Sequence, residues 1–283
     1  MLGAIYGDIV GSVYEFNNVK TKDFDLFCEK STFTDDTVMT LAVASALLFF
    51  DKTTAEIPVY SADCGCIQGG AEKKDTEYFK RILVSKLHKL GEKYPRAGYG
   101  ANFRCWLEEK DSKPYGSYGN GSAMRVSPVA WYAGSLGEAI DFAKASAEVT
   151  HDHPEGIKGA VVTAGATYLA RTGAAMEEIR AFVENYYKLG FTLDEIRPTY
   201  SFNETCQDTV PQAMQAFFES ESFEDAIRNA ISIGGDSDTL AAITGAVAEA
   251  YYTMSERESR DATDRLDPEL RKILKEFKRR FIK

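Results

Sequence analysis

Two acidic runs, far apart in the chain, each stand directly before a long apolar segment. The first is TDDT at 34–37, followed by VMTLAVASALLFF, and the second is GGDSDT at 234–239, followed by LAAITGAVAEAYY. Both apolar segments have the composition of buried helices, and acids and hydroxyls are typical of helix starts. If the fold brings the two starts together, four aspartates share a small space, and such close like charges cannot all stay ionised unless cations lie between them.

Helix capping is the alternative interpretation of either run taken alone. A cap needs one side-chain oxygen, whereas each run offers three or four. Carboxylate and hydroxyl oxygens are the ligands that hard divalent cations prefer. Because the pattern occurs twice, we favour a site for two divalent metal ions, and such a site is typical of a catalytic centre.

Apolar residues recur at helical spacing along most of the chain, and convincing period-two strands are absent from the sequence. With no internal repeat or linker, the economical interpretation is one all-α domain. Besides the two helices above, the spacing predicts helices over Thr76–Lys93, Gly100–Glu109, Gly137–Glu148, Pro154–Arg171, Met176–Leu189, Pro211–Ser220 and Phe223–Ile231, and an amphipathic helix over 271–283.

A helix predicted over residues 2–16 carries a stripe of small residues on one face. Its glycines recur four residues apart, at Gly3, Gly7 and Gly11. Since glycine costs helix stability, such a stripe usually marks the close approach of another helix. Asp8 lies beside the stripe and is either part of the acidic site or a buried acid paired with a helix terminus or hydroxyl. Glu15 lies on the same side as Asp8, or is an exposed acid at the helix end.

Composition and charge exclude several classes of protein. The formal net charge of −10 weighs against binding to a nucleic-acid backbone. An odd number of cysteines, five, predicts a reducing compartment, and we expect a cytoplasmic protein. Cys64 and Cys66 lack the spacing of a zinc site and predict a small-residue turn. The start of the chain does not resemble a signal peptide, and we expect no membrane span, since the apolar run 41–50 suits a core helix.

A glycine-rich loop, PYGSYGNGSAM at 114–124, is the second informative feature. Such a loop is either a plain connection between helices or a cradle of inward N–H groups for phosphate oxygens, where Tyr115 and Tyr118 could stack on a base. Two of the three histidines follow in THDHP at 150–154, where they could bind a metal or a phosphate, whereas His88 is expected at the surface.

Taken in order, these motifs resemble those of the ADP-ribosylglycohydrolase family, which includes the dinitrogenase reductase-activating glycohydrolase and the animal ADP-ribosyl-acceptor hydrolases. The matching segments are GDIVGSVYE, TDDT, GSYGNGSAMR, a Thr-His pair before a helix, and GGDSDT before a helix. They span almost the whole chain, and together they are highly specific. The resemblance implies an all-α orthogonal helical bundle over residues 1–283, with two Mg²⁺ ions, or Mn²⁺ as a substitute, in a central cleft at helix N-termini.

The resemblance also implies roles for particular residues. The metal ligands would be Thr34, Asp35, Asp36, Asp236, Asp238 and Thr239. ADP-ribose would contact Gly116, Ser117, Tyr118, Gly119, Asn120, Gly121 and His151. Glu15 matches a mobile glutamate that can approach the metals and the scissile bond, so Glu15, Asp35 and Asp36 are the candidate catalytic residues.

The implied activity is Mg²⁺-dependent hydrolysis of the glycosidic bond between ADP-ribose and a protein side chain or small molecule. The spacing from GSYGNG to His151 resembles the branch that acts on O-linked ADP-ribose, such as ADP-ribosylserine. The sequence departs from the family pattern in two respects. Ser237 stands where threonine is common in the family, at a position that is not expected to be a ligand. The chain is also shorter than the animal members, so we expect trimmed or rebuilt loops for recognition of the acceptor.

Two other interpretations stay open at the level of sequence. A relative that lost turnover would bind ADP-ribose or serve a structural role, although all six implied ligands and Glu15 are present. An HD-type metal phosphohydrolase is suggested by the dipeptide His151-Asp152, but such sites need further histidines along helices.

Overall fold

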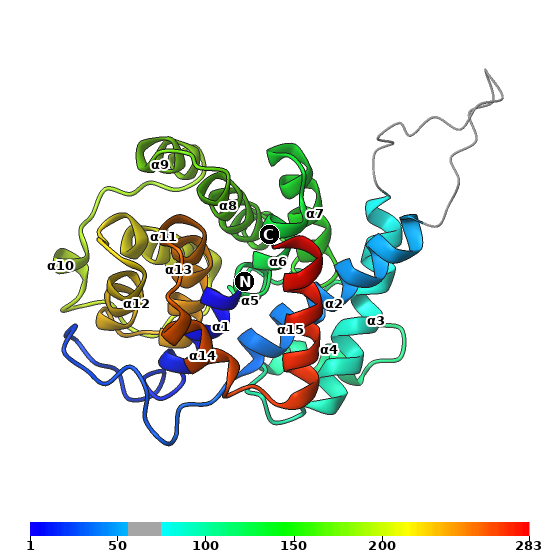
Figure 1. Ribbon diagram of the computed structural model, residues 1–283, viewed down its shortest axis with the longest axis horizontal. Helices are drawn as coiled ribbons and strands as arrows, with labels where there is room; N and C mark the ends of the chain where they lie inside the picture. The colour runs from blue at the N-terminus through cyan, green and yellow to red at the C-terminus, as the bar shows by residue number, and fades with distance from the viewer. Residues whose placement is uncertain (56–74, 283) are drawn as a thin grey trace.

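The computed structural model describes residues 1–55 and 75–282, and in these ranges every regular element is a helix (Figure 1). The predicted all-α class is confirmed. Cys64 and Cys66 lie outside the described residues. The helices are α1 (Leu2–Gly11), α2 (Asp35–Ala55), α3 (Thr76–Lys93), α4 (Ala101–Glu108), α5 (Gly121–Met124), α6 (Ser127–Tyr132), α7 (Leu136–Glu148), α8 (Pro154–Arg171), α9 (Met176–Glu184), α10 (Leu193–Ile196), α11 (Cys206–Phe218), α12 (Phe223–Ser232), α13 (Ser237–Tyr252), α14 (Glu256–Thr263) and α15 (Pro268–Phe281).

Helices α1 and α13 pack with their backbones in direct contact, and the glycine stripe explains why. A Cβ atom added at Gly7 would lie 2.1 Å from the carbonyl oxygen of Ala241, and one at Gly11 would lie 2.4 Å from Cα of Asp238. The two backbones therefore touch without intervening side chains. This contact confirms the predicted close approach and places α1 against the start of α13, which carries the second acidic run.

Helix α2 is a core helix that packs against α3, α6, α13 and α15 (Figure 1). Its residues Val38 to Ala44 are fully buried. By length and composition alone, Asp35–Thr54 could cross a membrane, a longer window than the sequence analysis expected from 41–50. In the structure, 61% of this window is buried inside the protein. The apolar content of α2 is thus used for packing inside the fold.

Three predicted helix boundaries are each wrong by five residues, and tertiary contacts account for two of them. Helix α9 ends at Glu184 rather than at the predicted Leu189. Helix α1 ends at Gly11 rather than at residue 16. At Gly11 its backbone meets the start of α13, and the chain turns away. Helix α11 begins at Cys206, so Pro211 lies inside it rather than in its first turn. The N–H of Cys206 donates to the carbonyl of Tyr118 at 2.9 Å, so pairing with the glycine-rich loop starts this helix early.

Candidate active site

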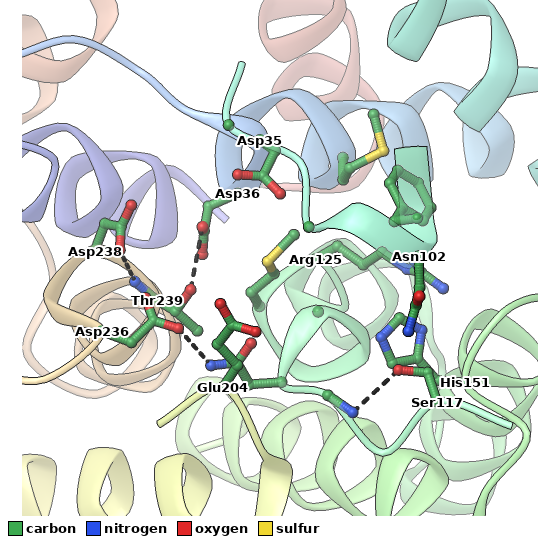
Figure 2. Close-up of a pocket in the computed structure, with 18 of the residues that line it drawn as sticks. Asp35, Asp36, Asn102, Ser117, Arg125, His151, Glu204, Asp236, Asp238 and Thr239 are labelled. Atoms are coloured by element: carbon green, nitrogen blue, oxygen red, sulfur yellow. Dashed lines mark hydrogen bonds between the residues drawn. The ribbon is translucent and has the colours of Figure 1, made fainter. Parts of the chain in front are cut away.

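A cleft lies where the N-terminal ends of α2, α4, α5 and α13 converge. In the close-up, Asp35, Asp36, Asp236 and Asp238 lie on one side, and Asn102, Ser117 and His151 lie on the other (Figure 2). We call the first group, together with Glu15 and Thr239, the acidic end. The second group, together with the glycine-rich loop and Arg125, is the histidine end.

The structure brings the two acidic runs together at the acidic end. The hydroxyl of Thr239 donates to Oδ2 of Asp36 at 3.2 Å, which links the first turns of α13 and α2 (Figure 2). Thr34 Oγ1 lies 3.5 Å from Oδ2 of Asp238. Asp36 and Asp238 are both buried. More than 200 residues separate these partners in sequence. Helix capping alone would not bring the two runs together, whereas a shared site requires it.

Asp8 adds a further carboxylate from α1, and its hydrogen bonds show what it does. Its Oδ1 accepts from the Thr34 hydroxyl at 2.6 Å, and its Oδ2 accepts from the backbone N–H groups of Thr34 and Thr37 at 2.9 and 3.1 Å. This is the pairing with a helix terminus and a hydroxyl that the sequence left open. Asp8 therefore caps α2 and fixes the position of Thr34.

Glu15 reaches the acidic end from the segment that follows α1, not from the helix itself. A carboxylate oxygen of Glu15 lies within 4.8 Å of carboxylate oxygens of Asp236 and Asp238. Asn18 holds this segment in place: its amide donates to the carbonyl of Glu15 at 2.8 Å, and its oxygen accepts from the N–H of Gly235 at 2.7 Å. One side chain thus ties the backbone of Glu15 to the loop that carries Asp236.

Burial and mutual repulsion raise the pKa values of these acids. Burial raises the pKa of Asp8 to about 6, despite its hydrogen bonds to Thr34 and Thr37. The pKa of Glu15 rises to about 7 through burial and the nearby charges of Asp236 and Asp8. Burial, and then neighbouring carboxylates, raise the pKa values of Asp35, Asp36 and Asp238 well above their usual range. Without a compensating cation, the acidic end cannot hold its full charge near neutral pH.

The residues present fit a site for hard divalent cations. Two groups of carboxylates could each surround an ion, one of Asp8, Asp36 and Asp238 and the other of Glu15, Asp236 and Asp238. Oδ1 of Asp36 is buried without a hydrogen-bond partner in the described part of the chain. A buried carboxylate oxygen left in this state is costly unless a cation or donor satisfies it. Asp238 belongs to both groups, so the arrangement suits two neighbouring ions.

The glycine-rich loop lines the histidine end through Ser117, Gly119, Asn120 and Gly121. The Asn120 amide donates to Oδ2 of Asp236 at 2.7 Å and so connects the loop to the acidic end. His151 is buried and also lines the cleft. All five of these residues were predicted to contact the substrate, and all five line the cleft. Their contacts with ADP-ribose stay a prediction.

Two residues of the loop lie outside the cleft lining. The N–H of Gly116 donates to Oδ1 of Asp152 at 2.7 Å, so this donor is already used. Tyr118 is 48% exposed, and its ring packs against His153 with 5.3 Å between centroids. Of the two tyrosines in the loop, Tyr115 and Tyr118, it is Tyr115 that lines the cleft. In this structure, therefore, Gly116 and Tyr118 do not face the site as the sequence predicted.

Several cleft residues were missed from the sequence. Arg125 ends the motif GSYGNGSAMR and lines the cleft, but it was not among the predicted site residues. The sequence alone does not distinguish a buried arginine at this position from a surface one. The remaining missed residues come from segments that carried no motif at all. They are Met39, Gly98, Gly100, Ala101, Asn102, Phe103, Phe202 and Glu204.

The histidines do not form the set that an HD-type phosphohydrolase needs. His88 is half-buried, as its helix packs against α4, and it stacks on Trp106 and bonds to Leu107 and Ser112 away from the cleft. His153 caps α8 by accepting from the N–H of Glu155 at 3.1 Å. Only His151 of the three lines the cleft. Their separation removes the geometric support for that alternative.

Proteins of one family are similar to this chain and match it over almost its whole length. A profile of the ADP-ribosylglycohydrolase family matches residues 1–279. The ADP-ribosylhydrolase ARH3 of Mus musculus is 26% identical, over 90% of this chain and 83% of its own length. The ADP-ribosyl-[dinitrogen reductase] glycohydrolase of Rhodospirillum rubrum is also 26% identical, over 89% and 83%. A solved structure described as an ADP-ribosylglycohydrolase-related protein complex shares the fold, with a TM-score of 0.65 and 21% identity over 98% of this chain and 96% of that one. The chain therefore belongs to the ADP-ribosylglycohydrolase family of glycosidic-bond hydrolases.

Proposed function

We propose that this protein uses two Mg²⁺ ions, or Mn²⁺ in their place, to hydrolyse the glycosidic bond between ADP-ribose and an acceptor linked through oxygen. Hydrolysis of ADP-ribose linkages and dependence on a metal are properties of the family. The observation that carries the proposal is the convergence of Asp36 and Asp238 with Glu15 in one cleft. The oxygen linkage rests on the spacing between the glycine-rich loop and His151.

The ligands of the two ions would be Asp35, Asp36, Asp236, Asp238, Thr34 and Thr239. Asp8 lies within reach of the first ion through the group it forms with Asp36 and Asp238. Its hydrogen bonds with Thr34 and Thr37 would hold Thr34 in place beside that ion. When bound, the ions would supply positive charge that polarises oxygen atoms at the scissile linkage and neutralises the surrounding carboxylates. The bound ions would thereby reduce the electrostatic repulsion between the acidic cleft and an anionic substrate.

The chain's own residues then divide the remaining work. The histidine end would bind the pyrophosphate part of ADP-ribose, where N–H groups of a glycine-rich loop can meet phosphate oxygens. Glu15 would take a proton from the water as its oxygen bonds to the anomeric carbon and the bond to the acceptor oxygen breaks. The acceptor oxygen leaves with that bond's electron pair and takes up a proton from solvent, and Glu15 returns its proton to solvent. A nearby carboxylate also stabilises the oxocarbenium-like transition state of such a cleavage. The products are ADP-ribose and the free acceptor.

A panel of defined substrates tests the proposal. Peptides carrying ADP-ribose on serine or on arginine are incubated with the protein, with Mg²⁺ or with EDTA, and released ADP-ribose is measured. We expect release from the serine-linked peptide only when Mg²⁺ is present. Full turnover in EDTA would overturn the role of the metal. Release from arginine alone would overturn the oxygen linkage, and Mg²⁺ and ADP-ribose binding without any release would indicate a silent relative.

A further inference from the structure

Arg125 is a buried cation with no carboxylate beside it. Its side chain is 1% exposed, and no acidic side chain lies within ion-pair distance of it in residues 1–55 and 75–282. Its Nη2 donates to the carbonyl of Ser146 at 2.7 Å and to the hydroxyl of Thr150 at 2.8 Å, both uncharged acceptors. Because burying a charge is costly unless it is paired, this arrangement calls for a function.

The hydrogen bonds of Thr150 have only one complete arrangement. Arginine is a donor only, so Thr150 Oγ1 accepts from Arg125 and keeps its own hydrogen to donate. The ring Nδ1 of His151 lies 2.6 Å from this oxygen, and it is the one acceptor within reach of the hydroxyl among the described residues. Thr150 is fully buried, so an unpaired hydroxyl hydrogen would be costly. The hydroxyl therefore donates to Nδ1.

A lone pair on Nδ1 leaves the ring hydrogen of neutral His151 on Nε2, which faces the glycine-rich loop. A Cβ atom added at Gly121 would lie 3.1 Å from Nε2, and one at Gly119 would lie 3.6 Å away. Side chains at these two positions would crowd that nitrogen. The glycines thus keep the space in front of Nε2 open at the histidine end of the cleft.

We propose that Arg125 and Thr150 are positioning residues that lock His151 in the tautomer with its hydrogen on Nε2, so that it donates a hydrogen bond to a phosphate oxygen of the substrate. The relay runs in one direction, from guanidinium to hydroxyl to Nδ1. The relay directs one neutral donor, the Nε2–H of His151, into the cleft. The positive charge of Arg125, which has no carboxylate partner, lies on the opposite side of the ring. This inference deepens the proposed function and rests on it for the identity of the anion.

The electrostatics of the relay agree with a neutral ring. Burial, followed by the charge of Arg125, holds the pKa of His151 well below its usual range. Burial lowers the pKa of Arg125 to about 10, which leaves the guanidinium charged at neutral pH. A neutral imidazole has one hydrogen to place on two nitrogens. The hydroxyl of Thr150 decides which nitrogen receives it.

Nitrogen NMR on the free protein tests the relay without any substrate. The chain has three histidines, so long-range ¹H–¹⁵N spectra of ¹⁵N-histidine-labelled protein contain three rings, and His151→Gln assigns the ring of interest. We expect His151 of the wild type at pH 7 to show an unprotonated Nδ1 and a protonated Nε2. Thr150→Val, which removes the hydroxyl at nearly constant volume, should produce a mixture of tautomers, and Thr150→Ser should restore one.

Thr167→Val is the matched control, because Thr167 is also buried but donates only to a carbonyl within α8. It should leave all three rings unchanged. A wild-type ring protonated on Nδ1, or a Thr150→Val ring that stays fully protonated on Nε2, would overturn the relay.

Calorimetry with ADP-ribose then tests the donor. Loss of one aimed hydrogen bond to a charged phosphate predicts that Thr150→Val weakens binding about tenfold. The effect should appear in KM with little change in kcat, and Thr150→Ser should recover it. Unchanged affinity in Thr150→Val would overturn the link from the tautomer to the phosphate. A wild-type protein that binds ADP-ribose with the expected tautomer but never releases it from a conjugate would instead overturn the proposed hydrolysis.

Discussion

The two ends of the cleft are built on opposite principles. At the acidic end, carboxylates from α2, α13 and the Glu15 segment crowd together, and none of Asp35, Asp36, Asp236 or Asp238 forms an ion pair in the described part of the chain. At the histidine end, Arg125 is buried with only neutral partners. One end thus lacks cations and the other lacks an anion. A ligand that brings a pyrophosphate to one end while metal ions occupy the other satisfies both.

Asp238→Asn should break the acidic end most completely. The substitution keeps the shape of a side chain shared by both carboxylate groups but removes its charge, so both cations lose a ligand. We expect hydrolysis to fall by at least about 10³-fold and Mg²⁺ affinity to fall with it, since metal and activity are linked. Initial rates and calorimetric Mg²⁺ titrations measure the two effects. Asp23→Asn, a change at an exposed acid, is the control, and equal losses in both variants would contradict the assignment.

Glu15→Gln should separate chemistry from binding. Removing a general base costs on the order of 10²- to 10⁴-fold in rate, so kcat should fall by about 10²-fold or more. Affinity for ADP-ribose should change little, because that molecule is held mainly at the histidine end. Steady-state kinetics and calorimetry on the same preparation show whether kcat falls while the affinity for ADP-ribose is retained. A kcat equal to that of the wild type would remove Glu15 from the reaction.

Gly7→Ala should test whether α1 and α13 must touch for the acidic end to form. The added methyl would lie 2.1 Å from a carbonyl oxygen of α13, and backbone cannot move aside as a side chain can. Overpacking of this kind costs about 1–3 kcal/mol in the free energy of unfolding, which denaturant titration measures.

Gly137→Ala in α7 is a matched control for that change. Gly137 lies in the first turn of α7, where a Cβ meets nothing closer than 4.0 Å. Alanine at such a compatible position stabilises the protein by about 0.4–1 kcal/mol, because it restricts the unfolded chain more than glycine does. The two variants should therefore shift the free energy of unfolding in opposite directions. If both stabilise the protein, the close helix contact is not as tight as described.

The dependence of stability on pH should distinguish the acidic end with and without metal. In the folded state the pKa of Asp8, beside this end, is raised to about 6, and that of Glu15 is raised to about 7. Between their ordinary and raised values, the folded state binds more protons than the unfolded chain, so the free energy of unfolding falls as pH rises. The melting temperature of metal-free protein should therefore fall by several degrees from pH 5 to pH 8.

Added Mg²⁺ should raise the melting temperature most at the high end of this range, where the carboxylates are ionised and free to bind it. Asp238→Asn should flatten both the pH dependence and the Mg²⁺ effect. Melting curves recorded by calorimetry across this range provide the test. A melting temperature that rises with pH in the absence of metal would contradict the repulsion described at this end.

Much of the acidic end could be predicted because its signals are local. The runs 34–37 and 234–239 combine oxygen donors with the first turn of an apolar helix, and their repetition pointed to one shared site. The glycine stripe at every fourth residue likewise predicted a close helix contact, since only close packing makes such a costly pattern useful. The all-α class followed from the same helical periodicity.

The histidine end was harder to predict because its features depend on burial and direction. The sequence shows an arginine after Met124 and a threonine before His151, but not that a buried guanidinium reaches that threonine. It did not show that Tyr118 turns out of the cleft while Tyr115 lines it. Nor did it show that pairing with the glycine-rich loop would start α11 five residues before Pro211.

By itself, the sequence determined the helical class, the family and the candidate oxygen ligands, since these depend on residue type and spacing along the chain. Only the tertiary structure decided which of them meet and which groups face them. It assigned Asp8 to capping α2, brought Glu15 in from outside the helix, and set a buried cation behind His151. The physical reason is that charge, desolvation and hydrogen-bond direction act over a few ångströms in space, and those distances exist only after distant segments have packed together.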